Sequence, residues 1–282
     1  MTLVLGIVGH PLDHSVSVPM HMSAIFSLGI DYVYMSFDIL PENLSHAVAQ
    51  FRKEHIKGFN VTIPYKEEIM PYLDSIDGYA GRIGAVNTVN NENGRLKGYN
   101  TDGIGYVRSL GEQTGFDPRG KQVLMIGAGG AAKAVAFSLL EAGADQIIIA
   151  NRTPERAEAL HRHLCIYFPA DSSQSIRIQD MKSLDHKKIN LVINTTSIGM
   201  KGAGDIDIEL SAFNSDTVVS DIVYNPLETP FLKRAKHAGL KTHDGAGMLV
   251  YQGAESFKLW TGVQPPVDVM RQAVLRALQE HH

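Results

Sequence analysis

The chain has 282 residues, of which 44% are hydrophobic and 20% are charged, and its formal net charge is −4. This length exceeds that of one typical domain, so two domains with sizeable cores are expected. The small net charge and the scattered lysines and arginines disfavour nucleic acid as the main partner and favour a small molecule.

Cysteine usage and apolar runs indicate the compartment. Cys165 is the single cysteine, which excludes an intrachain disulfide and is typical of a reducing environment. The chain starts without a charged leader-like stretch, and no apolar run approaches the ~20 residues of a membrane span. We therefore expect a soluble cytoplasmic protein, either a monomer or a homodimer, with no membrane partner.

The first part of the chain alternates between strand and helix patterns. The predicted elements are a strand at Leu3–Val8, a helix at Ser17–Leu28 closed by Gly29, a strand at Tyr32–Phe37, a helix at Pro41–Phe51 and a strand at Gly58–Ile63. This order predicts a mostly parallel sheet covered on both faces. Two further strands, Ala85–Val89 and Arg95–Tyr99, have the pattern of a hairpin, and a helix is expected from about Asp102.

A second α/β unit is predicted from Gln122 onward. Its expected strands are Gln122–Ile126, Gln146–Ala150, Leu191–Ile193 and Val218–Ile222, and its expected helices are Ala131–Ala142, one begun by Pro154, and Phe231–Ala238. From Met248 the chain has helical character that is broken at residues 264–266, where two prolines occur.

Two charged residues follow predicted strands at positions suited to chemistry. Lys66 ends the segment NVTIPYK, in which Pro64 stops ladder pairing, and Asp102 follows the strand that ends at Tyr99. In open α/β sheets, ligands bind in the crevice outside the carboxyl ends of strands. A Lys66/Asp102 pair is therefore the leading catalytic hypothesis, and a surface salt bridge is the alternative.

A glycine-rich turn between a strand and a helix predicts a dinucleotide site. Gly127, Gly129 and Ala132 fit the pattern G-x-G-x-x-A. The first glycine permits a tight turn, the second lets the backbone approach a pyrophosphate, and the small alanine allows close helix–strand packing.

The end of the following strand indicates which nucleotide binds. NAD-binding sites carry an acidic residue there for the ribose hydroxyls, but this chain has Asn151, Arg152 and Thr153. Arg152 offers a planar fork of donors suited to a phosphate, Arg156 adds positive charge, and Thr153 is expected to cap the next helix. NADP is therefore the expected cofactor.

The motifs together resemble the shikimate dehydrogenase family. They occur in the same order and spacing as in that family: Ser15–Ser17 with His21, NVTIPYK, Gly84–Thr88, NTDGIG at 100–105, the Gly127 loop, Asn151–Thr153 and Gly247–Gln252. The resemblance implies a reversible, NADPH-dependent reduction of 3-dehydroshikimate to shikimate in aromatic amino acid biosynthesis. The chain departs from the family pattern at Val18 and Met22.

The resemblance also implies roles for individual residues. It makes Lys66 and Asp102 catalytic and places the substrate on Ser15, Ser17, Thr62, Asn87, Tyr224 and Gln252. It places the cofactor on Gly127, Ala128, Gly129, Gly130, Ala131, Asn151, Arg152, Thr153, Arg156, Thr195, Gly245 and Met248. The implied fold is an α/β substrate domain of residues 1–103 and 244–282, a Rossmann dinucleotide-binding domain of residues 104–243, and a cleft between them.

Several alternatives remain at this level. Ser15 and Ser17 are also common helix caps, Asn87 a common turn residue, and Gln252 could lie on an exposed helix face. A paralogue that prefers quinate, often with NAD, or an aminoshikimate-type substrate would share the motifs, and so would a non-catalytic nucleotide-binding regulator. No metal is predicted, because Pro11 interrupts the helix that His10, His14 and His21 would need.

Overall fold

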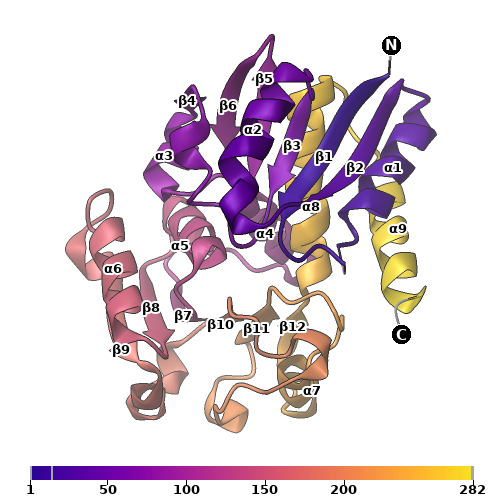
Figure 1. Cartoon of the computed structure of the whole chain (residues 1–282). Helices are drawn as coiled ribbons and strands as arrows, with labels where there is room; N and C mark the ends of the chain where they lie inside the picture. Colours follow the sequence, from indigo (N-terminus) through magenta and orange to yellow (C-terminus); the bar gives the residue numbers. More distant parts are fainter. Residues whose placement is uncertain (1, 14, 281–282) are drawn as a thin grey trace. The chain divides into compact units, whose positions relative to one another are not determined.

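A computed structural model describes residues 2–13 and 15–280 of the chain. It divides into two compact units, Met1–Asp102 with Val250–His282, and Gly103–Leu249. Each unit contains one six-stranded sheet (Figure 1). No helix among the described residues is both long and apolar enough to cross a membrane.

The sheet of the first unit is mixed, with the strand order β2-β1-β3-β5-β6-β4. Its strands are β1 (Leu3–Gly9), β2 (Tyr32–Asp38), β3 (Gly58–Val61), β4 (Ser75–Ile76), β5 (Thr88–Glu92) and β6 (Arg95–Tyr99). β1 pairs in parallel with β2 and β3, and β4 pairs in parallel with β6. β5 runs antiparallel to both of its neighbours, so three of the five pairings are parallel, as the strand–helix alternation predicts.

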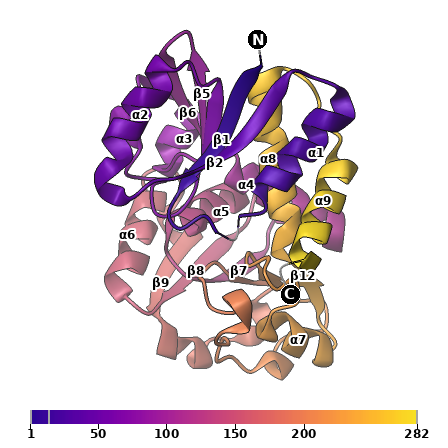
Figure 2. The ribbon, with the colours of Figure 1, turned by 45° about the vertical axis from the view of Figure 1, so that its right-hand side comes forward.

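Helices cover both faces of this sheet. The helices of the unit are α1 (Ser17–Leu28), α2 (Leu44–Lys53), α3 (Gly78–Ile83), most of α8 (Gly245–Thr261) and α9 (Val267–Glu280). α2 packs its apolar side, including Val48 and Phe51, against Phe59 and Val61 of the sheet. On the other face, the Trp260 ring of α8 donates a hydrogen bond to the Val89 carbonyl over 2.9 Å. α1 and α9 lie side by side (Figures 1 and 2).

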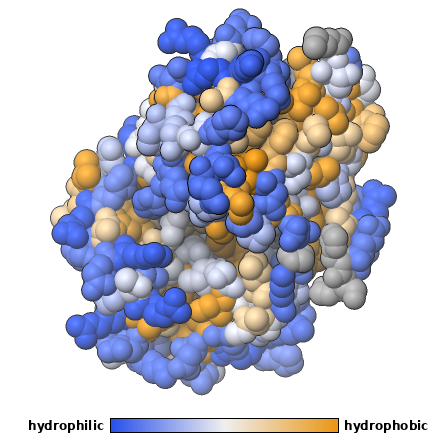
Figure 3. Space-filling model, viewed as in Figure 1, coloured by the Kyte–Doolittle hydropathy of each residue, from blue (hydrophilic) through white to orange (hydrophobic). Residues whose placement is uncertain are grey.

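The surface over β2 and α1 carries apolar side chains (Figure 3). β2 is an edge strand of the sheet, and its Met35 is half-exposed. Phe26 of α1 is the most exposed large apolar side chain among the described residues, at 76%. Single exposed apolar side chains of this kind are normal on a protein surface.

The sheet of the second unit is entirely parallel, with the order β12-β11-β10-β7-β8-β9. Its strands are β7 (Gln122–Ile126), β8 (Gln146–Asn151), β9 (Ser173–Arg177), β10 (Leu191–Asn194), β11 (Val218–Asp221) and β12 (Lys241–His243). The near-continuous apolar runs of the central strands, such as Leu191–Ile193, suit a sheet that is buried on both faces. The helices are α4 (Asp102–Thr114), α5 (Gly130–Glu141), α6 (Pro154–Leu164) and α7 (Pro230–His237).

Most predicted elements are present, and the differences have local causes. The third strand ends at Val61 rather than Ile63, because the chain turns where the Tyr65 N–H donates to the Thr62 carbonyl. The strand predicted from Ala85 begins at Thr88. The short elements β4, α3, β9 and β12 were not predicted, since two- to six-residue segments carry too little periodicity to recognise.

Gly58 provides a test of packing between β3 and α8. A Cβ atom at this position would lie 2.3 Å from the Trp260 ring and 2.8 Å from the Val89 carbonyl, so neither neighbour leaves room for it. We expect Gly58→Ala to lower the free energy of unfolding by about 1–3 kcal/mol, measured by urea denaturation. Gly78→Ala is the control, because a Cβ there has no atom of the described structure within 4 Å. Equal stability of the two variants would contradict this account.

Candidate active site

Lys66 and Asp102 form a close ion pair in the first unit. Lys66 Nζ donates to Asp102 Oδ2 over 2.6 Å, and the two side chains are only 15% and 5% exposed. A buried charge is stable only when it is paired and hydrogen-bonded. The structure thus brings together the two residues that the sequence singled out, in an environment unlike that of a surface salt bridge.

Backbone hydrogen bonds fix the segment that carries Lys66. The Thr62 N–H extends the ladder of β3 by donating to the Val8 carbonyl over 2.9 Å. After the turn at Tyr65, the Lys66 carbonyl accepts from the Val86 N–H over 2.7 Å. The Tyr65 side chain is fully buried and its hydroxyl donates to the Ile39 carbonyl. Tyr65 therefore helps to hold the neighbouring Lys66 backbone in place.

Asp102 is the first residue of α4, where the helix dipole favours a negative charge. Asn100 shapes the preceding turn: its Oδ1 accepts from the Asp102 N–H over 3.1 Å, and its Nδ2 donates to the Ala85 carbonyl over 2.9 Å. The second carboxylate oxygen, Asp102 Oδ1, accepts from Asn87 Nδ2 over 2.9 Å. Both carboxylate oxygens therefore have a donor.

Asn87 joins the Lys66–Asp102 pair to Gln252. Its Nδ2 also donates to Gln252 Oε1 of α8 over 3.2 Å. Its Oδ1 accepts from the Thr101 N–H over 2.8 Å, which fixes which end of the amide faces Asp102. Asn87 and Gln252 are only 2% and 8% exposed, so Asn87 is no ordinary turn residue and Gln252 is not on an exposed helix face.

The serines lie at the start of α1. Ser17 is its first residue, and its N–H donates to Ser15 Oγ over a long 3.4 Å. Val16, at the N-cap position, makes no side-chain cap bond. Thr62 is half-buried at the end of β3, and Tyr224 belongs to the second unit, on the loop after β11. The substrate contacts of these four residues remain predictions.

The glycine-rich turn has the backbone that its sequence predicts. Gly127 adopts φ +116°, and a Cβ there would lie 2.4 Å from Thr195 Oγ1, so only glycine fits. Gly129 is the N-cap of α5, and a Cβ there would have no described atom within 4 Å, which leaves room for a ligand beside the backbone. Ala132 is fully buried. These features fit a dinucleotide whose pyrophosphate lies at the start of α5.

The arginines near β8 suit a phosphate. Arg152 and Arg156 are exposed just beyond the carboxyl end of the strand. Asn151 Nδ2 donates to the Thr153 carbonyl over 2.8 Å and so orders this turn. The expectation that Thr153 caps α6 is wrong for its side chain: the residue holds the N-cap position, but its hydroxyl makes no cap hydrogen bond. The donors here fit a nucleotide that carries an additional phosphate.

Other residues predicted to bind cofactor lie around the same sheet. Thr195 follows β10, and its hydroxyl donates to the Ile126 carbonyl over 2.9 Å. Gly245 begins α8, where a Cβ would lie 2.3 Å from the Ile222 carbonyl. Met248 is 8% exposed. The remaining predicted positions, Ala128, Gly130 and Ala131, lie in the loop and the first turn of α5.

The histidines near the N-terminus have individual roles. His10 Nδ1 lies 2.6 Å from Asp38 Oδ1, and the hydrogen bonds from His10 and from the Leu12 N–H lower the pKa of Asp38. Burial lowers the pKa of His21 to about 3, so its ring is neutral and stacks on Tyr34 with centroids 4.2 Å apart. His14 lies outside the described residues.

The described residues hold no candidate metal cluster, and they place Cys165 beside a histidine. Within residues 2–13 and 15–280, no group of three or more His, Cys, Asp or Glu side chains is placed to hold a metal ion. Cys165 follows α6 and is half-buried beside His161, at 3.7 Å from its Nδ1.

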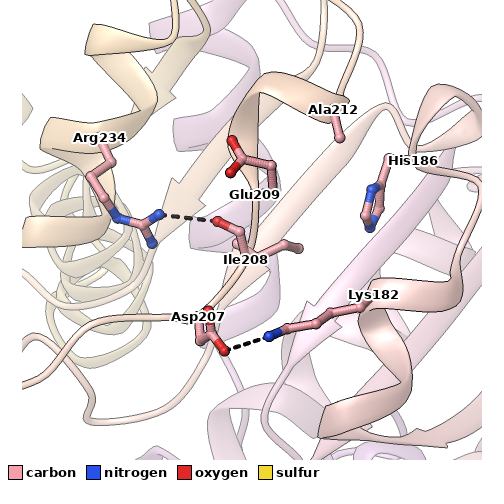
Figure 4. Close-up of a pocket in the computed structure, with 7 residues that line it drawn as sticks. All are labelled: Lys182, His186, Asp207, Ile208, Glu209, Ala212 and Arg234. Carbon is pink, nitrogen blue, oxygen red and sulfur yellow. Dashed lines mark hydrogen bonds and ion pairs between the residues drawn. The ribbon is translucent and has the colours of Figure 1, made fainter.

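A surface pocket of about 500 Å³ lies elsewhere in the second unit (Figure 4). Its lining charges are largely paired: Lys182 Nζ lies 2.9 Å from Asp207 Oδ2, and Arg234 donates to the Ile208 carbonyl over 3.0 Å (Figure 4). None of the predicted catalytic, substrate-binding or cofactor-binding residues lines it. The pocket is therefore separate from the candidate active site.

Asp221, at the end of β11, organises the loop that carries Tyr224. Its Oδ1 accepts from the Val223 N–H over 3.0 Å and from Asn194 Nδ2 over 2.9 Å. Its Oδ2 accepts from Thr229 Oγ1 over 2.8 Å. Asp221 is fully buried, and burial raises its pKa from 3.8 to about 6 despite these donors.

Comparison with known proteins identifies the family. The model of the shikimate dehydrogenase substrate binding domain matches residues 7–89. The shikimate / quinate 5-dehydrogenase model matches residues 109–200, and the shikimate 5'-dehydrogenase C-terminal domain model matches residues 245–275. The shikimate dehydrogenase (NADP(+)) of Methanocaldococcus jannaschii is 46% identical over 276 residues, which cover 97% of this chain and 96% of the relative. The chain belongs to the shikimate dehydrogenase family.

Solved structures of the family share the fold. The shikimate 5-dehydrogenase from Thermus thermophilus, in complex with NADP(H) and shikimate, is 37% identical with a TM-score of 0.86, over 98% of this chain and 100% of that one. Quinate dehydrogenase from Corynebacterium glutamicum, in complex with NAD, is 30% identical with a TM-score of 0.90, over 98% and 99% of the two chains. The same fold therefore occurs in a shikimate dehydrogenase and in a quinate dehydrogenase, so the choice between these substrates must depend on individual side chains.

Asp221 gives the second unit a pH-dependent stability. Because its folded pKa of about 6 exceeds the ordinary 3.8, the protonated acid favours folding, and this advantage is present below pH 4 and lost as pH rises through 6. The gap corresponds to about 3 kcal/mol. We expect the stability of the wild type relative to Asp221→Asn to fall by about this amount between pH 3 and pH 7.

Urea denaturation at several pH values measures this difference. Asp216→Asn, at an exposed carboxylate of the same unit, controls for the loss of one charge. Parallel pH profiles for the wild type and Asp221→Asn would show that Asp221 titrates alike in the folded and unfolded chain, against this prediction.

Proposed function

We propose that the protein is an NADP-dependent shikimate dehydrogenase that reversibly reduces 3-dehydroshikimate to shikimate. The observation that carries the proposal is the buried Lys66–Asp102 pair, held at 2.6 Å beside Asn87. Relatives that are about 46% identical over nearly the whole chain bear this name. In this role the enzyme serves aromatic amino acid biosynthesis.

We assign substrate binding to residues 1–103 and 244–282, and dinucleotide binding to residues 104–243. The substrate-binding domain model covers much of the first segment, and the glycine-rich turn at Gly127 lies within the second. We further infer a cytoplasmic enzyme that works on small molecules as a monomer or a homodimer. Analytical ultracentrifugation distinguishes the two states.

Bound NADPH supplies the hydride for the reduction. Lys66 stabilises the developing alkoxide on the substrate and donates a proton to it, because an ammonium group is both a cation and a donor. Asp102 keeps that ammonium in place through Oδ2, over 2.6 Å. In the reverse direction, the neutral Lys66 amine accepts the proton from the substrate hydroxyl.

Neutral polar groups bind the rest of the substrate. Ser15 and Ser17 donate to its carboxylate, joined by Tyr224, and Thr62, Asn87 and Gln252 hydrogen-bond its ring hydroxyls. A site built to pair hydroxyls rejects analogues that lack them, since its own buried polar groups would then be left without partners. The hydrogen bond from Asn87 Nδ2 to Gln252 Oε1 orients these two side-chain amides relative to each other.

The first experiment compares shikimate and quinate with NADP⁺ and NAD⁺ in all four combinations, followed by the nicotinamide absorbance. The highest rate is expected with shikimate and NADP⁺. A dominant rate with quinate or NAD⁺ would overturn the substrate or cofactor assignment while leaving the family. Inactivity in all four combinations would favour a regulator that has kept the fold.

Lys66→Ala tests the proton donor. Removal of a positioned acid–base group costs about 10²–10⁴-fold in rate, so kcat should fall within that range while the protein stays folded. Lys53→Ala, at an exposed lysine of α2, is the matched control and should keep full activity. A kcat of Lys66→Ala within threefold of the wild type would exclude this role.

Arg152→Ala tests the cofactor assignment. Loss of a charge-assisted hydrogen bond of about 1.5–3 kcal/mol should raise KM for NADP⁺ by about 10- to 100-fold and leave KM for NAD⁺ nearly unchanged. Arg162→Ala, at an exposed arginine of α6, is the control. An equal effect on both nucleotides would show that Arg152 does not recognise the 2′-phosphate.

A further inference from the structure

A cluster of buried hydroxyl groups lies behind Asn87. It consists of Thr88, Thr101 and Ser256, which are 0%, 3% and 0% exposed. Ser256 Oγ lies 2.7 Å from Thr88 Oγ1 and 3.2 Å from Thr101 Oγ1. The roles proposed above use neither Thr88 nor Ser256, although Ser256 lies one helical turn beyond Gln252.

Some of the hydrogen bonds around this cluster have a defined direction. Burial raises the pKa of Tyr34, so its hydroxyl stays protonated and donates to Asn60 Oδ1 over 2.8 Å. This bond turns Asn60 Nδ2 toward Ser256 Oγ, to which it donates over 3.0 Å. The Ser256 hydroxyl has two acceptors within reach, Thr88 Oγ1 at 2.7 Å and the Gln252 carbonyl at 3.0 Å. When it donates to Thr88 Oγ1, the Thr88 hydroxyl donates to Asn87 Oδ1 over 3.0 Å.

The chain of donors ends on the amide that faces the catalytic carboxylate. Asn87 Oδ1 accepts from the Thr88 hydroxyl and from the Thr101 N–H, so its Nδ2 must point to Asp102 Oδ1. A flipped amide would set an oxygen against the carboxylate and an NH₂ group against the Thr101 N–H. Hydrogen bonds in such a buried chain polarise and strengthen one another.

We propose that Thr88 and Ser256 are positioning residues for the reaction, which hold Asn87 and, through it, the Asp102 carboxylate that pairs with Lys66. The proposal rests on the proposed function for its catalytic consequence. It requires that the hydroxyl groups themselves matter, rather than the space that their side chains fill.

Thr88→Val and Ser256→Ala remove the hydroxyls with little change of shape. We expect kcat/KM for shikimate to fall about tenfold in each variant, and Thr88→Ser to retain wild-type activity because it keeps the donor. Thr217→Val and Ser23→Ala are matched controls: each loses a hydroxyl that donates to a backbone carbonyl, over 2.9 Å and 2.7 Å. Both controls should keep wild-type activity.

A double-variant comparison separates positioning from general destabilisation. In an Asn87→Ala background, Thr88→Val should change kcat/KM by less than twofold, because the residue through which it acts is gone. The same tenfold loss in both backgrounds would overturn the proposal, as would single variants within twofold of the wild type.

A measurement independent of turnover keeps the proposal testable if the chain does not oxidise shikimate. The side-chain ¹⁵N–¹H₂ resonance of Asn87, assigned by its loss in Asn87→Ala, should shift in Thr88→Val and Ser256→Ala and stay in place in both controls. An Asn87 resonance unchanged in both variants would overturn the positioning role, whereas an inactive wild type with a shifted resonance would refute only the proposed function.

Discussion

The carboxylate of Asp102 is the group on which the arrangement of the first unit depends. At 5% exposure it must be fully paired, because a buried charge without partners would cost several kcal/mol. Lys66 satisfies one oxygen and Asn87 the other. Asn87 can do so only in one orientation, which the Thr101 N–H and the Thr88 hydroxyl set. The contacts that stabilise the buried carboxylate therefore also fix its position beside Lys66.

In the second unit, the comparable constraint is the backbone conformation of the glycine-rich turn, not a buried charge. Gly127 has φ +116°, and a Cβ atom on it would lie 2.4 Å from Thr195 Oγ1. Glycine is therefore required here, and the hydrogen bond from the Gly127 N–H to the Ala150 carbonyl, over 2.9 Å, holds the turn in place. Such preorganisation lowers the entropy cost of binding.

Local signals were enough to predict most of the strands and the glycine-rich turn, since each depends on residues close together in sequence. They also placed Lys66 and Asp102 each after a strand, although the two residues are 36 positions apart. The hydroxyl cluster was beyond reach of the sequence, because Thr88 and Ser256 are 168 residues apart and meet only after the sheet and α8 pack. Spacing offered one clue, that Ser256 follows Gln252 by one turn. The wrong expectation for the Thr153 side chain shows that a cap position does not guarantee a cap bond.

The reversed direction of β5 determines which residues can meet. Thr88, at its start, pairs with Asn60 near the end of β3 and with Tyr99 at the end of β6. The segments that follow β3, precede β5 and follow β6 therefore lie at the same end of these three strands. These segments carry Lys66, Asn87 and Asp102. If β5 ran parallel to β3, Asn87 would lie at the opposite end of the strands. The antiparallel direction of β5 therefore places Asn87 where its Nδ2 can donate to Asp102 Oδ1.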